Sequence, residues 1–156
     1  YKTLPRNIKE KNKKIVMFGY GGAAQAIHYV LNKKGHKNIH IFNRSRKRLN
    51  FVNEQEYTLG KNKLKYALED ADLIINTTPI NPIKKEYTRL INKKTLLSDI
   101  VYKPKETDFL KSFPFNKKIY GISMLLEQAS PCFRGWIGFK PEIDQKLISI
   151  LERKIS

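Results

Sequence analysis

The chain has 156 residues, of which 40% are hydrophobic and 29% charged, a composition that fits one soluble globular domain with a buried core. Lysine and arginine total 31 and aspartate and glutamate total 14, so the formal net charge is +17. The single cysteine excludes a disulfide framework and a multi-thiolate zinc site. No apolar run approaches the roughly 20 residues of a membrane-spanning helix. We therefore expect no metal site and no membrane association.

The basic excess has two interpretations. A large positive charge is typical of proteins that bind nucleic acid or an anionic membrane. It also arises from codon bias in AT-rich genomes, and the chain is visibly rich in asparagine and isoleucine. The basic residues are spread through every segment instead of one stretch, which favours codon bias. We expect no nucleic-acid partner.

The first half of the chain predicts two strands and two helices. The apolar run 15–18 is too short for a buried helix and ends at a glycine, so it predicts a buried strand. From Gly21 apolar residues recur at helical spacing, and Gly35 predicts the end of that helix. A second strand is predicted over 38–43 and a short helix over 46–53.

The second half predicts three more strands and two closing helices. The strands are expected over 71–76, 95–101 and 119–120, and the helices over 124–136 and 142–155. Strands that alternate with helices imply a parallel sheet covered on both faces. The chain thus predicts an α/β fold, one doubly wound parallel sheet of the Rossmann type.

A glycine-rich turn joins the first predicted strand to the first predicted helix. It has the sequence Gly19-Tyr20-Gly21-Gly22-Ala23-Ala24, a G-x-G-x-x-A pattern. Gly19 would permit the tight turn, and Gly21 would let the backbone approach a pyrophosphate at the positive end of the helix. An ordinary glycine-rich turn is the alternative, but strand, spacing and helix together favour a dinucleotide site.

The second predicted strand ends in a basic run, Asn43-Arg44-Ser45-Arg46-Lys47-Arg48, that contains no acidic residue. NAD-binding folds usually carry Asp or Glu at this point to hold the ribose hydroxyls. Arginine instead binds a 2′-phosphate through charge-assisted hydrogen bonds. The pattern predicts NADP as the cofactor, with Arg44 as the first candidate. The alternative is that these arginines belong to the general basic excess.

Further motifs follow in order along the chain. Residues 71–79 are Ala-Asp-Leu-Ile-Ile-Asn-Thr-Thr-Pro, and 99–104 are Asp-Ile-Val-Tyr-Lys-Pro, with Thr107 after them. Residues 121–125 are Gly-Ile-Ser-Met-Leu, followed by Gln128 and Ala129. Together with the glycine turn and the Asn-Arg-Ser element, these motifs resemble the C-terminal, NADP-binding half of the shikimate dehydrogenases.

The resemblance covers about 14–151 and implies a set of site residues. It places Tyr102 and Gln128 at the substrate and no catalytic residue in this chain. The residues it implies for the cofactor are Gly19, Tyr20, Gly21, Gly22, Ala23, Asn43, Arg44, Ser45, Arg48, Asn76, Thr77, Thr78, Pro79, Ile100, Gly121 and Met124.

The resemblance also implies an activity and a domain organisation. The reaction would be the NADPH-dependent reduction of 3-dehydroshikimate to shikimate, a step of aromatic amino acid and chorismate biosynthesis in the cytoplasm. In that family the catalytic Lys and Asp belong to an N-terminal substrate domain whose motifs do not occur here. We expect a fragment: 1–13 lead in from that domain, 14–140 form the NADP-binding domain and 141–156 the C-terminal helix. A homodimer of the full-length enzyme stays open.

Alternative functions stay open too. They are a quinate/shikimate dehydrogenase, the NADP domain of a glutamyl-tRNA reductase-like enzyme, and a stand-alone module that binds NADP or nucleic acid. Asn81 stands where the family usually has glycine, which leaves its effect on the nicotinamide end open. Among the other residues, we expect His28 at the helix surface and Cys132, Phe133 and Trp136 in the core.

Overall fold

The computed structural model describes residues 1–44 and 61–155. Within them a five-stranded sheet has the order β2-β1-β3-β4-β5, and every neighbouring pair is parallel. The strands are β1 (Ile15–Phe18), β2 (Ile39–Phe42), β3 (Leu73–Asn76), β4 (Leu96–Asp99) and β5 (Lys118–Ile119). The chain runs outward from β1 to β2 and then continues on the other side of β1 with β3. The predicted doubly wound α/β fold is confirmed, and its switch point lies between β1 and β3.

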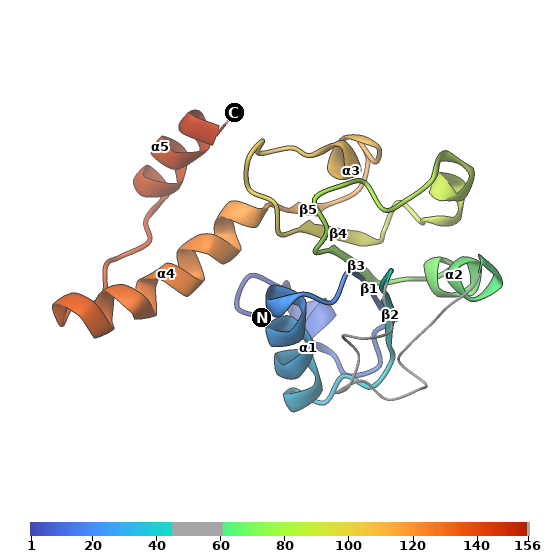
Figure 1. The fold of residues 1–156 in the computed structure, drawn as a ribbon, viewed down its shortest axis with the longest axis horizontal. Coiled ribbons are helices and arrows are strands. Elements are labelled where there is room, and N and C mark those ends of the chain that lie inside the picture. The colour runs from blue at the N-terminus through green and yellow to red at the C-terminus, as the bar shows by residue number, and fades with distance from the viewer. Residues whose placement is uncertain (45–60, 156) are drawn as a thin grey trace.

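The helices cover the sheet unevenly (Figure 1). One face carries α1 with the N-terminal segment, the other carries α2, η3 and α3, and α4 and α5 extend away from the sheet. The helical elements are η1 (Arg6–Lys9), α1 (Gly22–Lys33), α2 (Lys61–Leu68), η3 (Lys85–Leu90), α3 (Asp108–Lys111), α4 (Gly121–Ile137) and α5 (Gln145–Ile155). No helix in the described part of the chain is long and apolar enough to cross a membrane.

Strand β1 shows why its sequence is continuously apolar. Ile15 and Met17 pack into the cluster under α1, whereas Val16 and Phe18 pack into the cluster under α2, η3 and α3. All four side chains are buried. Successive residues of a strand point to opposite faces, so a strand covered on both faces has no polar position. The prediction of a buried strand at 15–18 is therefore confirmed.

The end of α1 is also confirmed. Gly35 has a φ of 90°, and its N–H donates to the carbonyl of Asn32. The N–H of His36 donates to the carbonyl of Leu31, five residues back. This is the Schellman arrangement, in which a left-handed glycine lets the last carbonyls of the helix find donors.

Most other predicted elements are confirmed with shifted ends. Helix α4 begins at Gly121 and α5 at Gln145, where the sequence predicted 124 and 142. Helix α2 was missed because its eight residues are mostly polar. Of its side chains described at 63–68, only Ala67 and Leu68 at the C-terminal end are buried. The helix predicted over 46–53 lies outside the described residues.

Three expected core residues of α4 are exposed instead. Phe133 is 42% and Trp136 is 79% exposed, and Cys132 is exposed as well. These expectations were wrong because the C-terminal half of α4 extends away from the sheet, so its apolar positions face no layer of the domain (Figure 1). Helix α5 likewise buries no residue.

Candidate functional site

The turn after β1 depends on a glycine in the left-handed region. Gly19 has a φ of 89°, and a Cβ at this position would lie 2.5 Å from Oγ1 of Thr77. Thr77 is held there because its hydroxyl and its backbone N–H donate to the carbonyl of Phe18, at 2.6 and 2.9 Å. The loop after β3 therefore lies directly against the glycine turn, at the switch point where ligands bind in such folds.

The following glycines face open space. A Cβ at Gly21 or Gly22 would meet no heavy atom within 4 Å. Gly21 is the N-cap of α1 and provides no side-chain hydrogen bond, and the first turn of the helix contains no acidic residue. The N-terminal N–H groups and the positive end of the helix dipole thus face an uncrowded surface that suits an anion.

The end of β2 lies beside this turn. Phe18 pairs with Phe42 in the parallel ladder, and the N–H of Gly19 donates to the carbonyl of Phe42 at 2.8 Å. Asn43 is half-buried and Arg44 is exposed immediately after the strand. The structure therefore brings Arg44 to the same edge of the sheet as the glycine turn. The predicted Ser45 and Arg48 lie outside the described residues.

Asn76, at the end of β3, has an amide that is engaged within the protein. Its Nδ2 lies 3.1 Å from Oδ2 of Asp99 and also donates to the carbonyls of Thr78 and Ile80. Its Oδ1 accepts from the N–H and the hydroxyl of Thr78. Asn76 is only 1% exposed, so its side chain shapes the loop that carries Thr78 and Pro79.

Asn81 is engaged with α3. Its Nδ2 donates to Oγ of Ser112 at 3.0 Å, and its Oδ1 accepts from the N–H of Ile83 at 3.0 Å. The side chain of Asn81 is thus held by hydrogen bonds on the side of the loop that faces α3.

A cavity of about 410 Å³ opens between the N-terminal segment, α1 and the start of α4. It brings together four predicted site residues, Ala23, Ile100, Met124 and Gln128. Tyr102 is 44% exposed and does not line it. The rest of the wall is largely apolar and includes Leu4, Ala26, Ile27, Val30, Ile75 and Ile119.

The start of α4 is fixed against the loop after β4. A Cβ at Gly121 would lie 2.5 Å from the carbonyl oxygen of Ile100 and 2.6 Å from that of Val101. Only a residue without a side chain permits this approach, so Gly121 sets where Met124 and Gln128 of the same helix stand.

The side chain of Tyr20 points into the protein, not toward the open surface. It is 2% exposed, and its hydroxyl lies 2.8 Å from Nδ1 of His28 on α1. Nε2 of His28 lies 2.8 Å from Nδ2 of Asn32, one turn further along. The expectation of a surface His28 was wrong, because this residue is 4% exposed and shares the buried face of α1 with Ala24 and Leu31.

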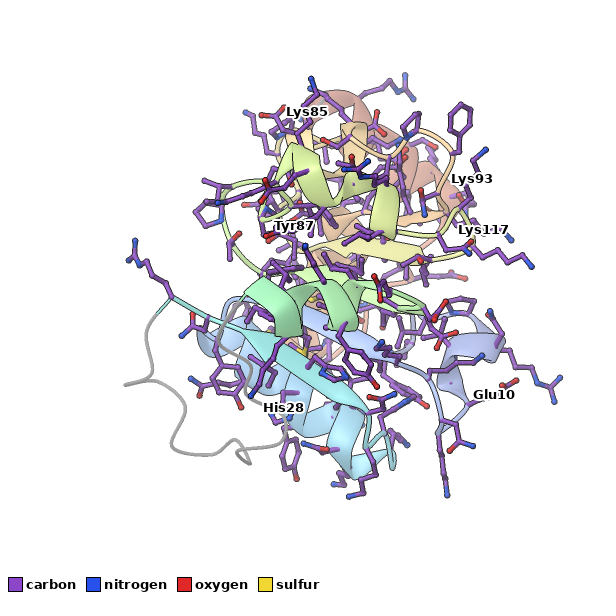
Figure 2. All side chains as sticks on the ribbon, turned by 90° about the vertical axis from the view of Figure 1, so that its right-hand side faces the viewer. Glu10, His28, Lys85, Tyr87, Lys93 and Lys117 are labelled. Carbon is purple, nitrogen blue, oxygen red and sulfur yellow. The ribbon has the colours of Figure 1, made fainter. Side chains whose placement is uncertain are left out.

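Charged groups are spread over the molecule. The exposed Lys85, Lys93 and Lys117 come from η3, from the loop after it and from the loop before β5 (Figure 2). Among the residues that the structure describes, no group of three or more His, Cys, Asp or Glu side chains is placed to hold a metal ion.

The chain is similar to proteins of one family in sequence and in fold. The family described as shikimate / quinate 5-dehydrogenase matches residues 3–105. The shikimate dehydrogenase (NADP(+)) of Bartonella tribocorum is 37% identical over 155 residues, which cover 88% of this chain and 52% of that protein. The chain thus spans about half the length of the curated relatives it matches.

Solved structures of shikimate dehydrogenases have the same fold as this chain. The shikimate dehydrogenase of Aquifex aeolicus is 29% identical with a TM-score of 0.73, covering 99% of this chain and 57% of that one. The enzyme of Thermus thermophilus in complex with NADP(H) and shikimate is 22% identical and has the same fold, with a TM-score of 0.74 over 99% of this chain and 60% of that one. From the matched sequence and the shared fold, this chain belongs to the shikimate / quinate dehydrogenase family.

Proposed function

We propose that this chain is the NADP-binding part of a shikimate dehydrogenase. One observation carries the proposal: the uncrowded N-terminus of α1 and the exposed Arg44 lie at the same edge of the sheet, with no acidic residue at the end of β2. The names of relatives at up to 37% identity, shikimate dehydrogenase (NADP(+)), support the choice of cofactor.

The described residues fit the parts of NADP. The pyrophosphate would lie at Gly21 and Gly22, where a Cβ would meet open space and the helix offers N–H groups. The 2′-phosphate would lie at Arg44, whose guanidinium provides charge-assisted donors. Residues for the nicotinamide end are those at the carboxyl edge of β3 and β4 and at the start of α4, namely Thr77, Thr78, Pro79, Ile100, Gly121 and Met124.

The whole protein would reduce 3-dehydroshikimate to shikimate, and the bound nicotinamide would supply the hydride. The part of this chain in that reaction is to bind and orient. Gln128 lines the cavity beside Met124, and its amide can both donate to and accept from a substrate hydroxyl. Tyr102 would contact the substrate from the loop after β4. The proton for the developing alkoxide would come from the Lys and Asp of the family's substrate domain.

Calorimetric titration of the chain with NADP and with NAD tests the proposal. We expect NADP to bind more tightly, and Arg44→Ala to weaken NADP binding by about 10- to 150-fold, the range of a charge-assisted hydrogen bond. NAD binding should stay nearly unchanged. Arg89→Ala, which removes an exposed arginine from η3, is the matched control for the loss of one positive charge.

Two results would contradict the proposal. An equal loss for NADP and NAD in Arg44→Ala would make Arg44 a structural residue. No binding of NADP, together with tight binding of a short polynucleotide that falls steeply with salt, would assign the net charge of +17 to a nucleic-acid partner instead.

A further inference from the structure

We propose that the buried Tyr20 side chain, held by His28 and Asn32 of α1, positions the glycine turn for the pyrophosphate of the cofactor. This inference rests on the proposed NADP site and adds three positioning side chains to it. None of them is expected to touch the cofactor through its side chain.

The hydrogen bonds and the burial of Tyr20 support this role. Its hydroxyl reaches Nδ1 of His28 at 2.8 Å, across eight residues of sequence, and the two rings meet edge to face at 5.6 Å. Asn32 contacts the other ring nitrogen of His28 at 2.8 Å. From the same helix, Nε2 of Gln25 donates to the carbonyl oxygen of Tyr20 at 3.4 Å. Helix α1 therefore holds both the side chain and the backbone of Tyr20.

The position of Tyr20 within the glycine turn explains why its contacts can order that turn. Tyr20 is the only residue of 19–22 with a side chain. Glycine loses more backbone freedom on ordering than any other residue, so a turn with three glycines orders at a high entropic cost unless something restrains it. Tyr20 supplies that restraint. A turn that is already ordered presents its N–H groups to an anion without this cost at the moment of binding.

The hydroxyl of Tyr20 is the group to test, because the ring alone explains only packing. The ring belongs to the apolar cluster between α1 and the sheet, and phenylalanine would fill the same space. A neutral imidazole has one donor and one acceptor nitrogen, so His28 can bond the hydroxyl on one side and the amide of Asn32 on the other. Tyr20→Phe removes the link between the turn and His28 and keeps the packing.

The experiment compares two ligands by calorimetry. NADP carries both the pyrophosphate and the 2′-phosphate, whereas 2′-AMP carries only the 2′-phosphate that Arg44 would bind. For Tyr20→Phe we expect the Kd of NADP to rise about 2- to 12-fold, the range of one neutral hydrogen bond, and the Kd of 2′-AMP to stay unchanged. A general loss of folding would weaken both ligands together. Tyr29→Phe, which removes an exposed hydroxyl from the same helix, should change neither Kd.

Variants of His28 extend the test and keep it decisive if Tyr20→Phe folds poorly. His28→Asn places an amide near the position of Nδ1 and should retain more NADP affinity than His28→Leu. Combining Tyr20→Phe with His28→Leu should cost no more NADP affinity than His28→Leu alone, because both changes break the same link.

The outcomes separate this inference from the proposed function. If the unaltered chain binds NADP and Tyr20→Phe binds it equally well, the positioning role is wrong and the NADP site stands. The role is also wrong if NADP and 2′-AMP weaken equally. If the unaltered chain does not bind NADP, the proposed function itself is overturned.

Discussion

The hydroxyl of Thr107 donates a 2.6 Å hydrogen bond to Oδ2 of Asp99. The same oxygen accepts from Nδ2 of Asn76 at 3.1 Å, and Oδ1 of Asp99 accepts from the N–H of Val101 at 3.0 Å. Asp99 is 1% exposed, and Thr107 is also the N-cap of α3, where it accepts from the N–H of Leu110. One buried carboxylate thus joins the ends of β3 and β4 to the start of α3.

We predict that Thr107→Val destabilises the chain and that Thr107→Ser does not. Valine keeps the shape of threonine, but it removes one donor from the buried carboxylate and the cap from α3. The expected loss in the free energy of unfolding is about 2–3 kcal/mol, against less than about 1 kcal/mol for serine, which keeps the hydroxyl. Urea unfolding followed by circular dichroism measures both. Equal losses would mean that the methyl group matters and the hydroxyl does not.

A second prediction separates the two kinds of glycine in the turn. Gly19→Ala forces a side chain into the left-handed region and toward Oγ1 of Thr77, so we expect a loss of at least about 2 kcal/mol in the free energy of unfolding. Gly22→Ala adds a Cβ in open space and should change stability by less than about 0.5 kcal/mol. If an anion lies there, the same Cβ should weaken NADP binding.

The two glycine variants therefore need two measurements each, thermal unfolding and NADP titration. Gly22→Ala should weaken NADP binding without changing the free energy of unfolding. Gly19→Ala should lower the free energy of unfolding. A Gly22→Ala variant that binds NADP as tightly as the unaltered chain would remove the pyrophosphate from this position.

The parts of the fold that could be predicted are those that local sequence determines. The run 15–18 and the glycine after it define a buried strand and its turn without reference to the rest of the chain. Helix α2 could not be found in this way, because only Ala67 and Leu68 are buried among its side chains at 63–68 and its stability comes from the layer it packs on. For Phe133 and Trp136 the helix was predicted correctly but the burial was not. They are exposed because no layer of the domain covers them.

In the candidate site, too, the sequence predicted the features set by local spacing and missed those set by tertiary contacts. The glycine turn and Arg44 could be found because their spacing relative to a strand has a direct chemical meaning. The pairing of Tyr20 with His28 could not, because a histidine eight residues along the chain carries no sequence signal of its own. Nor did the sequence show that the amide of Asn76 is used to build the loop, since that depends on Asp99 of the neighbouring strand.

A third prediction concerns pH. His36 is fully buried, and burial lowers the pKa of its imidazole below the ordinary value of about 6.5. Neither of its ring nitrogens has a hydrogen-bond partner among the described residues. The folded chain therefore takes up a proton at His36 only at a lower pH than the unfolded chain, in which the imidazole is protonated as the pH falls through about 6.5. The free energy of unfolding should be unaffected by His36 above this pH and should decrease as the pH falls below it.

Thermal unfolding at pH 7.5 and pH 5.5 measures this effect, with His36→Leu as the variant that cannot titrate. We expect the difference in Tm between the two pH values to be smaller in His36→Leu than in the unaltered chain. His40, whose pKa is lowered by burial and by Lys14, should account for part of the remainder. An unchanged difference in Tm would assign the pH dependence to other groups.

The last prediction tests how α4 is attached. Gly121→Ala would bring a Cβ to 2.5 Å from the carbonyl oxygen of Ile100, a backbone atom that cannot turn aside as a side chain can. Either the helix or the loop after β4 must move, so we expect a loss of at least about 2 kcal/mol in the free energy of unfolding. Gly135 lies in the same helix with open space around it, and Gly135→Ala should stabilise the chain by about 0.5–1 kcal/mol.

Circular dichroism during urea unfolding is the suitable readout for this pair, because the only tryptophan, Trp136, is already 79% exposed in the folded chain and its fluorescence would change little on unfolding. A Gly121→Ala variant as stable as the unaltered chain would show that α4 shifts along the loop at little cost. The contact at Gly121 would then not fix Met124 and Gln128 in the cavity. Their proposed contacts with the nicotinamide and the substrate would require other residues to hold α4 in place. A clear loss at Gly121 with a gain at Gly135 would instead show that one backbone contact sets the position of both side chains.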